Sequence, residues 1–308
     1  MSARTDTRSE RLTARESAVL AAVERRLNNP EIAAELFISV RTVESHIASL
    51  KRKLGAETRA ELIAAAGERR ERAASVRLPR NAFVGRDAEL SALSSLLDEH
   101  RWVTVVGPGG VGKTRLALEF ASRNERVPII VELEHAEPGD VIARIARALD
   151  LEAGPGSDVA TPVVMALAAH PYLLVLDNID RVGNAVGEIV ARAQATALEL
   201  RVLTTSRTPI GDAVEAVYPL HPLPVGSTDA AAVAMFLDRL GAAGRTAASP
   251  MRLSSALPSR GDLELAALVC ERLDGLPLAI ELAAAVARHL SLDELAARLD
   301  RDFATLDR

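Results

Sequence analysis

The sequence predicts a multidomain protein: an all-α domain first, then an α/β domain with a parallel sheet, then an α-helical domain. Three observations support this fold class. Residues 12–66 contain four amphipathic helical patterns and no strand pattern. Residues 102–218 alternate short, almost wholly apolar stretches with helical patterns, which is typical of a parallel sheet covered on both faces. From about residue 226 the strand patterns disappear and helical patterns remain.

In the first domain, capping residues set the expected helix boundaries. Thr13 and Glu16 form a capping box at the start of the first helix. Ser39 caps the third helix and Gly55 stops it. A fourth helix is expected over residues 57–66, followed by a linker or solvated helix extension rich in Arg and Glu.

The expected elements of the other two domains follow from apolar periodicity. Strands are expected at 102–106, 128–133, 172–176, 200–204 and 214–218. Helices are expected at 113–122, 139–149, 158–169, 184–198, 229–240, 262–273, 277–289 and 292–299. Residues 1–10 are expected to be disordered, and 241–261 to form a flexible loop.

Composition limits the function classes. The single cysteine, Cys270, excludes an internal disulfide and fits a reducing compartment. No signal peptide opens the sequence, and no run of about 18 apolar residues predicts a membrane span. A cytoplasmic location without a membrane partner is therefore expected. Residues 1–80 hold 16 Lys and Arg against 11 Asp and Glu, whereas the whole chain has a net charge of −5. This asymmetry favours a polyanionic partner for the first domain, although a solvated basic face would explain it too.

A short helix, a tight turn and a longer helix give the first domain the layout of a helix-turn-helix. Its segments Leu12–Glu16, Asn29–Ala33, Ile38–Ile47 and Lys51–Gly55 closely resemble the LuxR-type DNA-binding domain over roughly residues 9–67. The resemblance implies a four-helix domain that inserts its third helix into the major groove, often as a dimer formed through the fourth. The promoter-recognising end of sigma factors contains a similar module and is the alternative.

The outward positions of the third helix are the expected DNA contacts. Its basic side chains can meet phosphates, while Glu44 and Ser45 lie where base edges would be recognised. His46 either touches a phosphate or packs between helices, and an ordinary solvated face is the alternative for the charged residues. The predicted DNA-binding residues are Arg41, Thr42, Glu44, Ser45, His46, Lys51 and Arg52.

The expected strand 102–106 runs directly into the pattern G-x-x-x-x-G-K-T, residues 107–114. Such a loop directs successive backbone N–H groups toward one point, and the helix that follows adds its positive dipole end. Lys113 can reach β- and γ-phosphates, and the Thr114 hydroxyl can ligate Mg²⁺. A glycine-rich turn with a chance lysine is the alternative.

Two further strands end in charged residues. The strand Leu173–Asp177 ends in a carboxylate 63 residues after Thr114, where a P-loop enzyme has its Mg²⁺-side acid. A helix-capping aspartate is the alternative. The strand Val202–Arg207 ends in a cation that could stabilise a terminal phosphate, with a solvated arginine as the alternative.

Together with Phe83–Leu90 and Leu273–Ala283, these motifs resemble NB-ARC and related STAND-type NTPases over about residues 80–308. The resemblance implies that the segment around Arg86 closes over adenine, although a surface arginine is the alternative. It also implies that Arg207 senses the γ-phosphate and that Pro277 lies against adenine, at a hinge linking nucleotide state to domain position. Asp180 stands where bacterial members commonly have glutamate, so fast hydrolysis is not expected.

The predicted site residues follow from these motifs. The catalytic set is Lys113, Asp177, Asp180 and Arg207, and the Mg²⁺ ligands are Thr114 and Asp177. The nucleotide-binding set is Val84, Gly85, Arg86, Gly107, Pro108, Gly109, Gly110, Val111, Gly112, Lys113, Thr114, Arg115 and Pro277. The expected cofactors are ATP or ADP with Mg²⁺.

The predicted domains are a LuxR-type helix-turn-helix domain (1–67), a linker (68–82), a P-loop NTPase domain (83–225) and a helical NB-ARC-like domain (226–308). The family usually continues with a winged helix, so we expect either a fragment or a protein that works without it. The predicted function is a nucleotide-controlled transcription regulator, at most a slow ATPase, whose partners are double-stranded DNA and further copies of itself. A P-loop ATPase enzyme and a hydrolysis-dead nucleotide-binding scaffold are the alternatives.

Overall fold

The computed structural model describes residues 12–73, 76–151, 159–243, 259–287 and 289–306. The chain divides into two compact units that interleave along the sequence. The first unit contains the N-terminal helices and most of the sheet; it comprises residues 1–77, 96–104 and 120–217. The second contains the glycine-rich loop and the C-terminal helices; it comprises residues 78–95, 105–119 and 218–308. The expected regions 1–10 and most of 241–261 lie outside the described residues.

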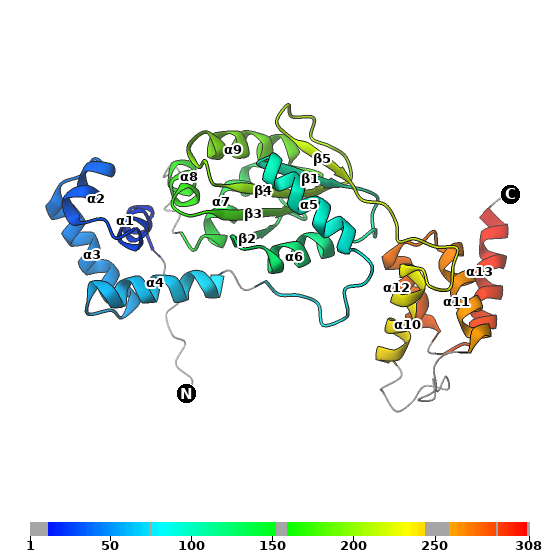
Figure 1. Ribbon diagram of the computed structural model, residues 1–308. Helices are drawn as coiled ribbons and strands as arrows, with labels where there is room; N and C mark the ends of the chain where they lie inside the picture. The colour runs from blue at the N-terminus through cyan, green and yellow to red at the C-terminus, as the bar shows by residue number, and fades with distance from the viewer. Residues whose placement is uncertain (1–11, 74–75, 152–158, 244–258, 288, 307–308) are drawn as a thin grey trace, which may run out of the picture. The chain divides into compact units, whose positions relative to one another are not determined.

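Four helices form the N-terminal domain (Figure 1). Their bounds are α1 (Ala14–Glu24), α2 (Asn29–Glu35), α3 (Val40–Leu54) and α4 (Arg59–Ala73). The predicted caps are confirmed: Thr13 and Glu16 make a capping box, Ser39 caps α3, and Gly55 ends α3 in the left-handed conformation with φ of 66°. The helices bury a shared apolar core that includes Val19, Ile32, Val43, Leu50 and Leu62.

The central elements form a five-stranded sheet in the order β2-β3-β4-β1-β5. Its strands are β1 (Trp102–Val106), β2 (Val127–Glu132), β3 (Tyr172–Asp177), β4 (Arg201–Ser206) and β5 (Ala216–Pro219). The pairs β2–β3 and β3–β4 are parallel, with Ile130 opposite Val175 and Val175 opposite Leu203. The predicted strands agree with these to within about two residues.

Helices cover this sheet, which explains why β3 is buried throughout its length and apolar up to its last residue, Asp177. The helices between the strands are α6 (Lys113–Arg123), η1 (Pro138–Asp140), α7 (Val141–Ala148), α8 (Ala160–Ala168) and α9 (Gly183–Thr196). The helices α7, α8 and α9 share one core with the alternate β3 residues Leu174 and Leu176 (Figure 1). Leu173 and Val175, which point to the opposite face, are also fully buried.

The C-terminal region is helical, as predicted. Its helices are α10 (Ala231–Ala243), α11 (Arg260–Arg272), α12 (Pro277–Val286) and α13 (Leu292–Leu306). They enclose a core of their own around Phe236, Val269 and Ile280. Cys270 is buried in this core, and burial raises the pKa of its thiol to about 12.

Two helices differ from the sequence prediction. The fourth helix was expected over residues 57–66, followed by a linker or a solvated helix extension; α4 continues to Ala73, so the helix extension is the correct alternative up to that residue. Helix α5 (Asp87–Glu99) is not among the expected helices, although Leu90, Leu93 and Leu97 recur at helical spacing and are buried. Among the described residues, no helix combines the length and apolar character that crossing a membrane requires.

Candidate nucleotide site and DNA-binding face

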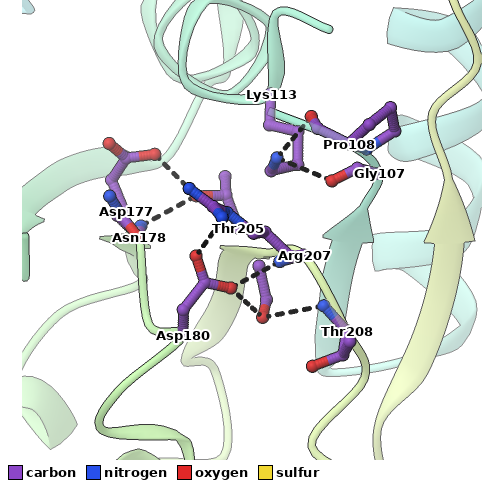
Figure 2. A network of polar contacts seen from close by, with 10 residues as sticks. Gly107, Pro108, Lys113, Asp177, Asn178, Asp180, Thr205, Arg207 and Thr208 are labelled. Atoms are coloured by element: carbon purple, nitrogen blue, oxygen red, sulfur yellow. Dashed lines mark hydrogen bonds and ion pairs between the residues drawn. The ribbon is translucent and has the colours of Figure 1, made fainter. Parts of the chain in front are cut away.

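The glycine-rich loop lies between β1 and α6, in the second unit. Gly110 and Gly112 adopt φ of 77° and 97°, a backbone region that disfavours other residues. A Cβ at Gly107 would lie 2.7 Å from the carbonyl oxygen of Leu220. The Nζ atom of Lys113 donates to the carbonyl oxygens of Gly107 at 2.8 Å and Pro108 at 2.9 Å (Figure 2). The loop therefore has the backbone shape of a phosphate-binding loop, with its lysine folded over it.

Arg86 is the second predicted nucleotide contact in this unit. Its side chain is buried and donates to the carbonyl oxygens of Val111 at 3.3 Å and His221 at 2.8 Å. An ion pair of 2.6 Å joins it to Glu89. The alternative of a surface arginine is therefore wrong: Arg86 ties the start of α5 to the phosphate loop. Its contact with adenine stays a prediction.

The other predicted nucleotide residues outside the loop and α6 belong to the start of α12 and to the segment before α5. The first turn of α12 contacts the loop directly: the backbone N–H of Leu278 donates to the carbonyl oxygen of Gly110 at 3.1 Å. Pro277 Cγ lies 3.8 Å from where a Cβ on Gly112 would be. Val84 packs against the C-terminal helical core, and Gly85 adopts φ of 68°. The motif around Pro277 thus reaches the phosphate loop through backbone atoms.

Arg115 has a role that the sequence did not reveal. Its guanidinium donates to the carbonyl oxygens of Pro79 and Asn81, each at 3.1 Å, and lies over the ring of Phe83. It also pairs with Glu119 at 3.4 Å. The structure therefore places this side chain on the segment before α5, and its nucleotide contact stays a prediction.

The first unit contains the predicted acidic residues, at the carboxyl ends of β3 and β4. Asp177 is only 8% exposed and accepts a hydrogen bond of 2.6 Å from the Thr205 hydroxyl. The same hydroxyl accepts from the backbone N–H of Asn178 at 2.9 Å. Asn178 itself adopts φ of 60°. Thr205 therefore fixes both the carboxylate and the turn that follows β3 (Figure 2).

Asp180 and Arg207 lie together next to this group. One carboxylate oxygen of Asp180 accepts from the Ser206 hydroxyl at 2.9 Å and from the Arg207 backbone N–H at 2.6 Å. The Arg207 guanidinium is 3.6 Å from the other oxygen and its side chain is 73% exposed. Sequence reasoning missed Thr205 and Ser206; the signal available was a run of three hydroxyl residues, Thr204 to Ser206, at the end of β4.

The loop with Lys113 and Thr114 and the acidic group with Asp177 belong to different compact units. Their meeting around one magnesium ion stays a prediction. Within the described residues, no three His, Cys, Asp or Glu side chains form a cluster that could hold a metal alone. This donor set suits Mg²⁺, which usually takes one or two protein oxygens and completes its shell with phosphates and water.

The third helix presents the predicted DNA-binding face. Arg41, Thr42, Glu44 and Ser45 are exposed, while His46 is half-buried. Thr42 is held by the α3 cap, because its backbone N–H donates to the Ser39 hydroxyl at 3.1 Å. Lys51 and Arg52, at the end of the helix, donate to the Glu57 carbonyl oxygen and the Ser49 hydroxyl.

A buried carboxylate joins α3 to the rest of the N-terminal domain. Glu16 accepts from the Ser49 hydroxyl at 2.6 Å and from Lys53 Nζ at 2.8 Å. Burial by itself would raise the pKa of Glu16, but these bonds and those to Thr13 outweigh it and lower the pKa to about 2. The carboxylate is therefore ionised across the physiological range and anchors α3 against α1.

Two family models match the chain. The model of bacterial regulatory proteins of the luxR family matches residues 10–66, and the NB-ARC domain model matches residues 87–220. A Mycobacterium tuberculosis protein named as an HTH-type transcriptional regulator is 36% identical over 217 residues, which are 70% of this chain and 23% of that protein. An uncharacterized protein of the same species is 33% identical over 235 residues, 74% of this chain and 56% of its own length. The chain thus spans about a quarter of the first relative and little more than half of the second.

Solved structures share the fold at low identity. The Walker-type ATPase of Pyrococcus abyssi superposes with a TM-score of 0.52 at 14% identity, covering 76% of this chain and 77% of that one. A chain from the structure of Drosophila ORC bound to DNA superposes with a TM-score of 0.52 at 16% identity, covering 71% and 65%. The chain therefore carries a luxR-family helix-turn-helix domain joined to an NB-ARC domain with the fold of P-loop ATPases.

Proposed function

We propose that the chain is a transcription regulator whose helix-turn-helix domain binds double-stranded DNA under the control of ATP or ADP bound to its NTPase domain. The observation that supports nucleotide control is the backbone hydrogen bond between Gly110 and Leu278. Gly110 belongs to the loop that would surround the phosphates, and Leu278 lies in the first turn of α12, one of the C-terminal helices. A phosphate entering the loop therefore acts on a helix of the neighbouring core, which suits a switch.

In this proposal, Lys113 and Thr114 contact the phosphates, and Thr114 and Asp177 hold Mg²⁺. When bound, Mg²⁺ neutralises phosphate charge and fixes phosphate orientation. Lys113 exchanges its two carbonyl acceptors for phosphate oxygens, which are stronger acceptors because they are charged. Thr205 keeps the Asp177 carboxylate in one orientation, so no ordering of that side chain is needed on binding.

The surroundings of Asp180 support slow hydrolysis. A general base must accept a proton from an attacking water. One oxygen of Asp180 already accepts two hydrogen bonds, and Arg207 lies beside the other. Both carboxylate oxygens of Asp180 therefore already have partners, which fits a residue that positions Arg207 for a terminal phosphate.

The test is fluorescence anisotropy on a DNA duplex selected by the chain from a random-sequence pool. Binding would be measured with ATP, with ADP and without nucleotide, each with Mg²⁺. We expect affinities that differ by about tenfold between nucleotide states, the usual size of such coupling. Lys113→Ala is the control and should show one affinity throughout. Equal affinities in the wild-type chain, with calorimetry showing bound nucleotide, would remove the control function.

A plain ATPase enzyme and a hydrolysis-dead scaffold make different predictions. Turnover above about 1 s⁻¹ would favour an enzyme, since enzymes commonly run at that rate or faster. If Asp180→Ala leaves a slow turnover unchanged, Asp180 is not the general base. Sedimentation with ATP and with ADP would show whether copies of the chain assemble, as the proposal expects, in a nucleotide-dependent way.

A further inference from the structure

The helix-turn-helix domain is seated on the NTPase domain within the first unit. Helix α1 packs against α8, and Met165 of α8 lies against the apolar core of the helix-turn-helix domain. Leu12, just before α1, forms an isolated parallel bridge with Leu151 of the NTPase domain, and both side chains are 4% exposed. The contact therefore includes apolar packing and backbone pairing; we call it the α1–α8 interface.

A carboxylate–imidazole pair lies at the same interface. Glu24, the last residue of α1, is 2.9 Å from Nε2 of His170, and the two side chains are only 13% and 15% exposed. The His170 ring meets the ring of Tyr172, the first residue of β3, edge-on at 5.5 Å. The pair thus joins α1 to the start of the strand that ends at Asp177.

The space at this interface is small. A hollow of about 80 Å³ lies between Leu20 and Glu24 on one side and Ala166 and His170 on the other. A drug-sized ligand needs a pocket of roughly 300 Å³ or more, so the hollow has room for a few waters only. The α1–α8 interface is therefore a packing surface for the helix-turn-helix domain and not a ligand pocket.

The DNA-binding face is left open by this seating. Arg41, Thr42, Glu44 and Ser45 of α3 all remain exposed while α1 is packed on α8. We infer that the helix-turn-helix domain binds DNA while seated on the NTPase domain through the α1–α8 interface. The NTPase domain then sets the orientation and spacing of these domains in an assembly, and does not cover or uncover α3. The control of orientation and spacing by nucleotide rests on the proposed function. The packing of α1 on α8 and the exposure of the DNA-binding face of α3 do not depend on it.

The direct test is a disulfide across the interface. Paired strands lie about 4.8 Å apart and disulfides join Cα atoms about 4.4–6.8 Å apart, so Leu12→Cys with Leu151→Cys should crosslink. Cys270→Ala removes the native thiol. We expect the oxidised chain to bind the pool-selected duplex within about twofold of its reduced form, without added nucleotide. Thiols that stay unpaired in the folded chain, or an oxidised form that binds DNA about tenfold more weakly than the reduced one, would overturn the inference.

Charge exchange at the interface gives a second test, whose added substitutions lie outside the apolar cores. In the double-cysteine background, Glu24→Lys and His170→Glu should each slow crosslinking by about threefold, because each places like or unmatched charges together. The combined variant restores opposite charges and should regain the original rate. A combined variant no faster than the single ones would show that this pair does not hold the interface. Neither test uses nucleotide, so failure of nucleotide control would not produce these outcomes.

Discussion

The phosphate loop and the acidic group are built in different ways. The loop is shaped by backbone: two glycines at positive φ, a third beside the Leu220 carbonyl, and a lysine bonded to main-chain oxygens. The acidic group is shaped by side chains, since Thr205 and Ser206 orient the carboxylates of Asp177 and Asp180. The loop should therefore be sensitive to added volume, and the acidic group to lost hydroxyls.

The largest expected effect is on the loop. Lys113→Ala removes the cation that would balance the phosphates, and we expect nucleotide affinity to fall about a hundredfold, or about 3 kcal/mol. Calorimetry with Mg-ATP measures this. Arg123→Ala, at the other end of α6, is the control and should retain binding. Undiminished binding by Lys113→Ala would contradict the phosphate role of the loop.

A pair of glycine variants tests the claim that backbone shape defines the loop. Gly110→Ala forces a Cβ to 2.9 Å from Leu278 Cβ at φ of 77°, so stability should fall by about 1–3 kcal/mol. Gly109→Ala meets no atom within 4 Å and should change stability by less than about 0.5 kcal/mol. Thermal unfolding compares them. Equal losses of stability in the two variants would show that the space for a side chain at Gly110 does not limit the conformation of the loop.

A hydroxyl deletion tests the acidic group. Thr205→Val leaves the buried Asp177 carboxylate and the Asn178 N–H without their shared partner, at a cost of about 2 kcal/mol in unfolding free energy. Mg-ATP binding should weaken with it. Thr208→Val, at an exposed position, is the matched control and should cost little. No difference between the two in urea unfolding would mean that Thr205 does not organise Asp177.

The smallest effect concerns Glu16, a buried carboxylate of the N-terminal domain that is held by Ser49, Thr13 and Lys53. Its pKa is about 2 in the folded chain and near 4.3 when unfolded. Its stabilising contribution is therefore present above about pH 4.3 and is lost as the pH falls toward 2. Glu16→Gln should lower stability at pH 7 by about 1–2 kcal/mol and flatten this acid dependence. If the free energy of urea unfolding fell equally below pH 4.3 in the wild-type chain and in Glu16→Gln, the lowered pKa of Glu16 would be contradicted.

The contrast between local backbone shape and contacts of distant side chains also explains which features could be predicted from the sequence. Periodicity and caps predicted the strands and most helices, because alternation and capping are local signals. The phosphate loop was visible for the same reason: its glycines are required by local backbone shape. Contacts between distant segments were not visible. Arg115 bonding to Pro79, Thr205 bonding to Asp177, and Glu24 pairing with His170 each depend on tertiary placement.

The helix extents that were missed have a similar cause. Residues 67–73 have no apolar face, so the sequence left open whether they form a linker or a solvated helix extension, and in the structure they continue α4. Helix α5 begins inside the motif Phe83–Leu90, which was interpreted for nucleotide binding and not for its helical spacing. In both places the local sequence pattern was too weak to indicate the full extent of the helix.

The most direct test of the account asks whether the two groups act on one ion. Thr114→Ala, Asp177→Asn and the double variant would be titrated with ATP in calorimetry, once with Mg²⁺ and once with EDTA. We expect a coupling of about 1–2 kcal/mol between the substitutions with Mg²⁺ and none with EDTA. Effects that add fully in both buffers would contradict a shared magnesium–nucleotide site.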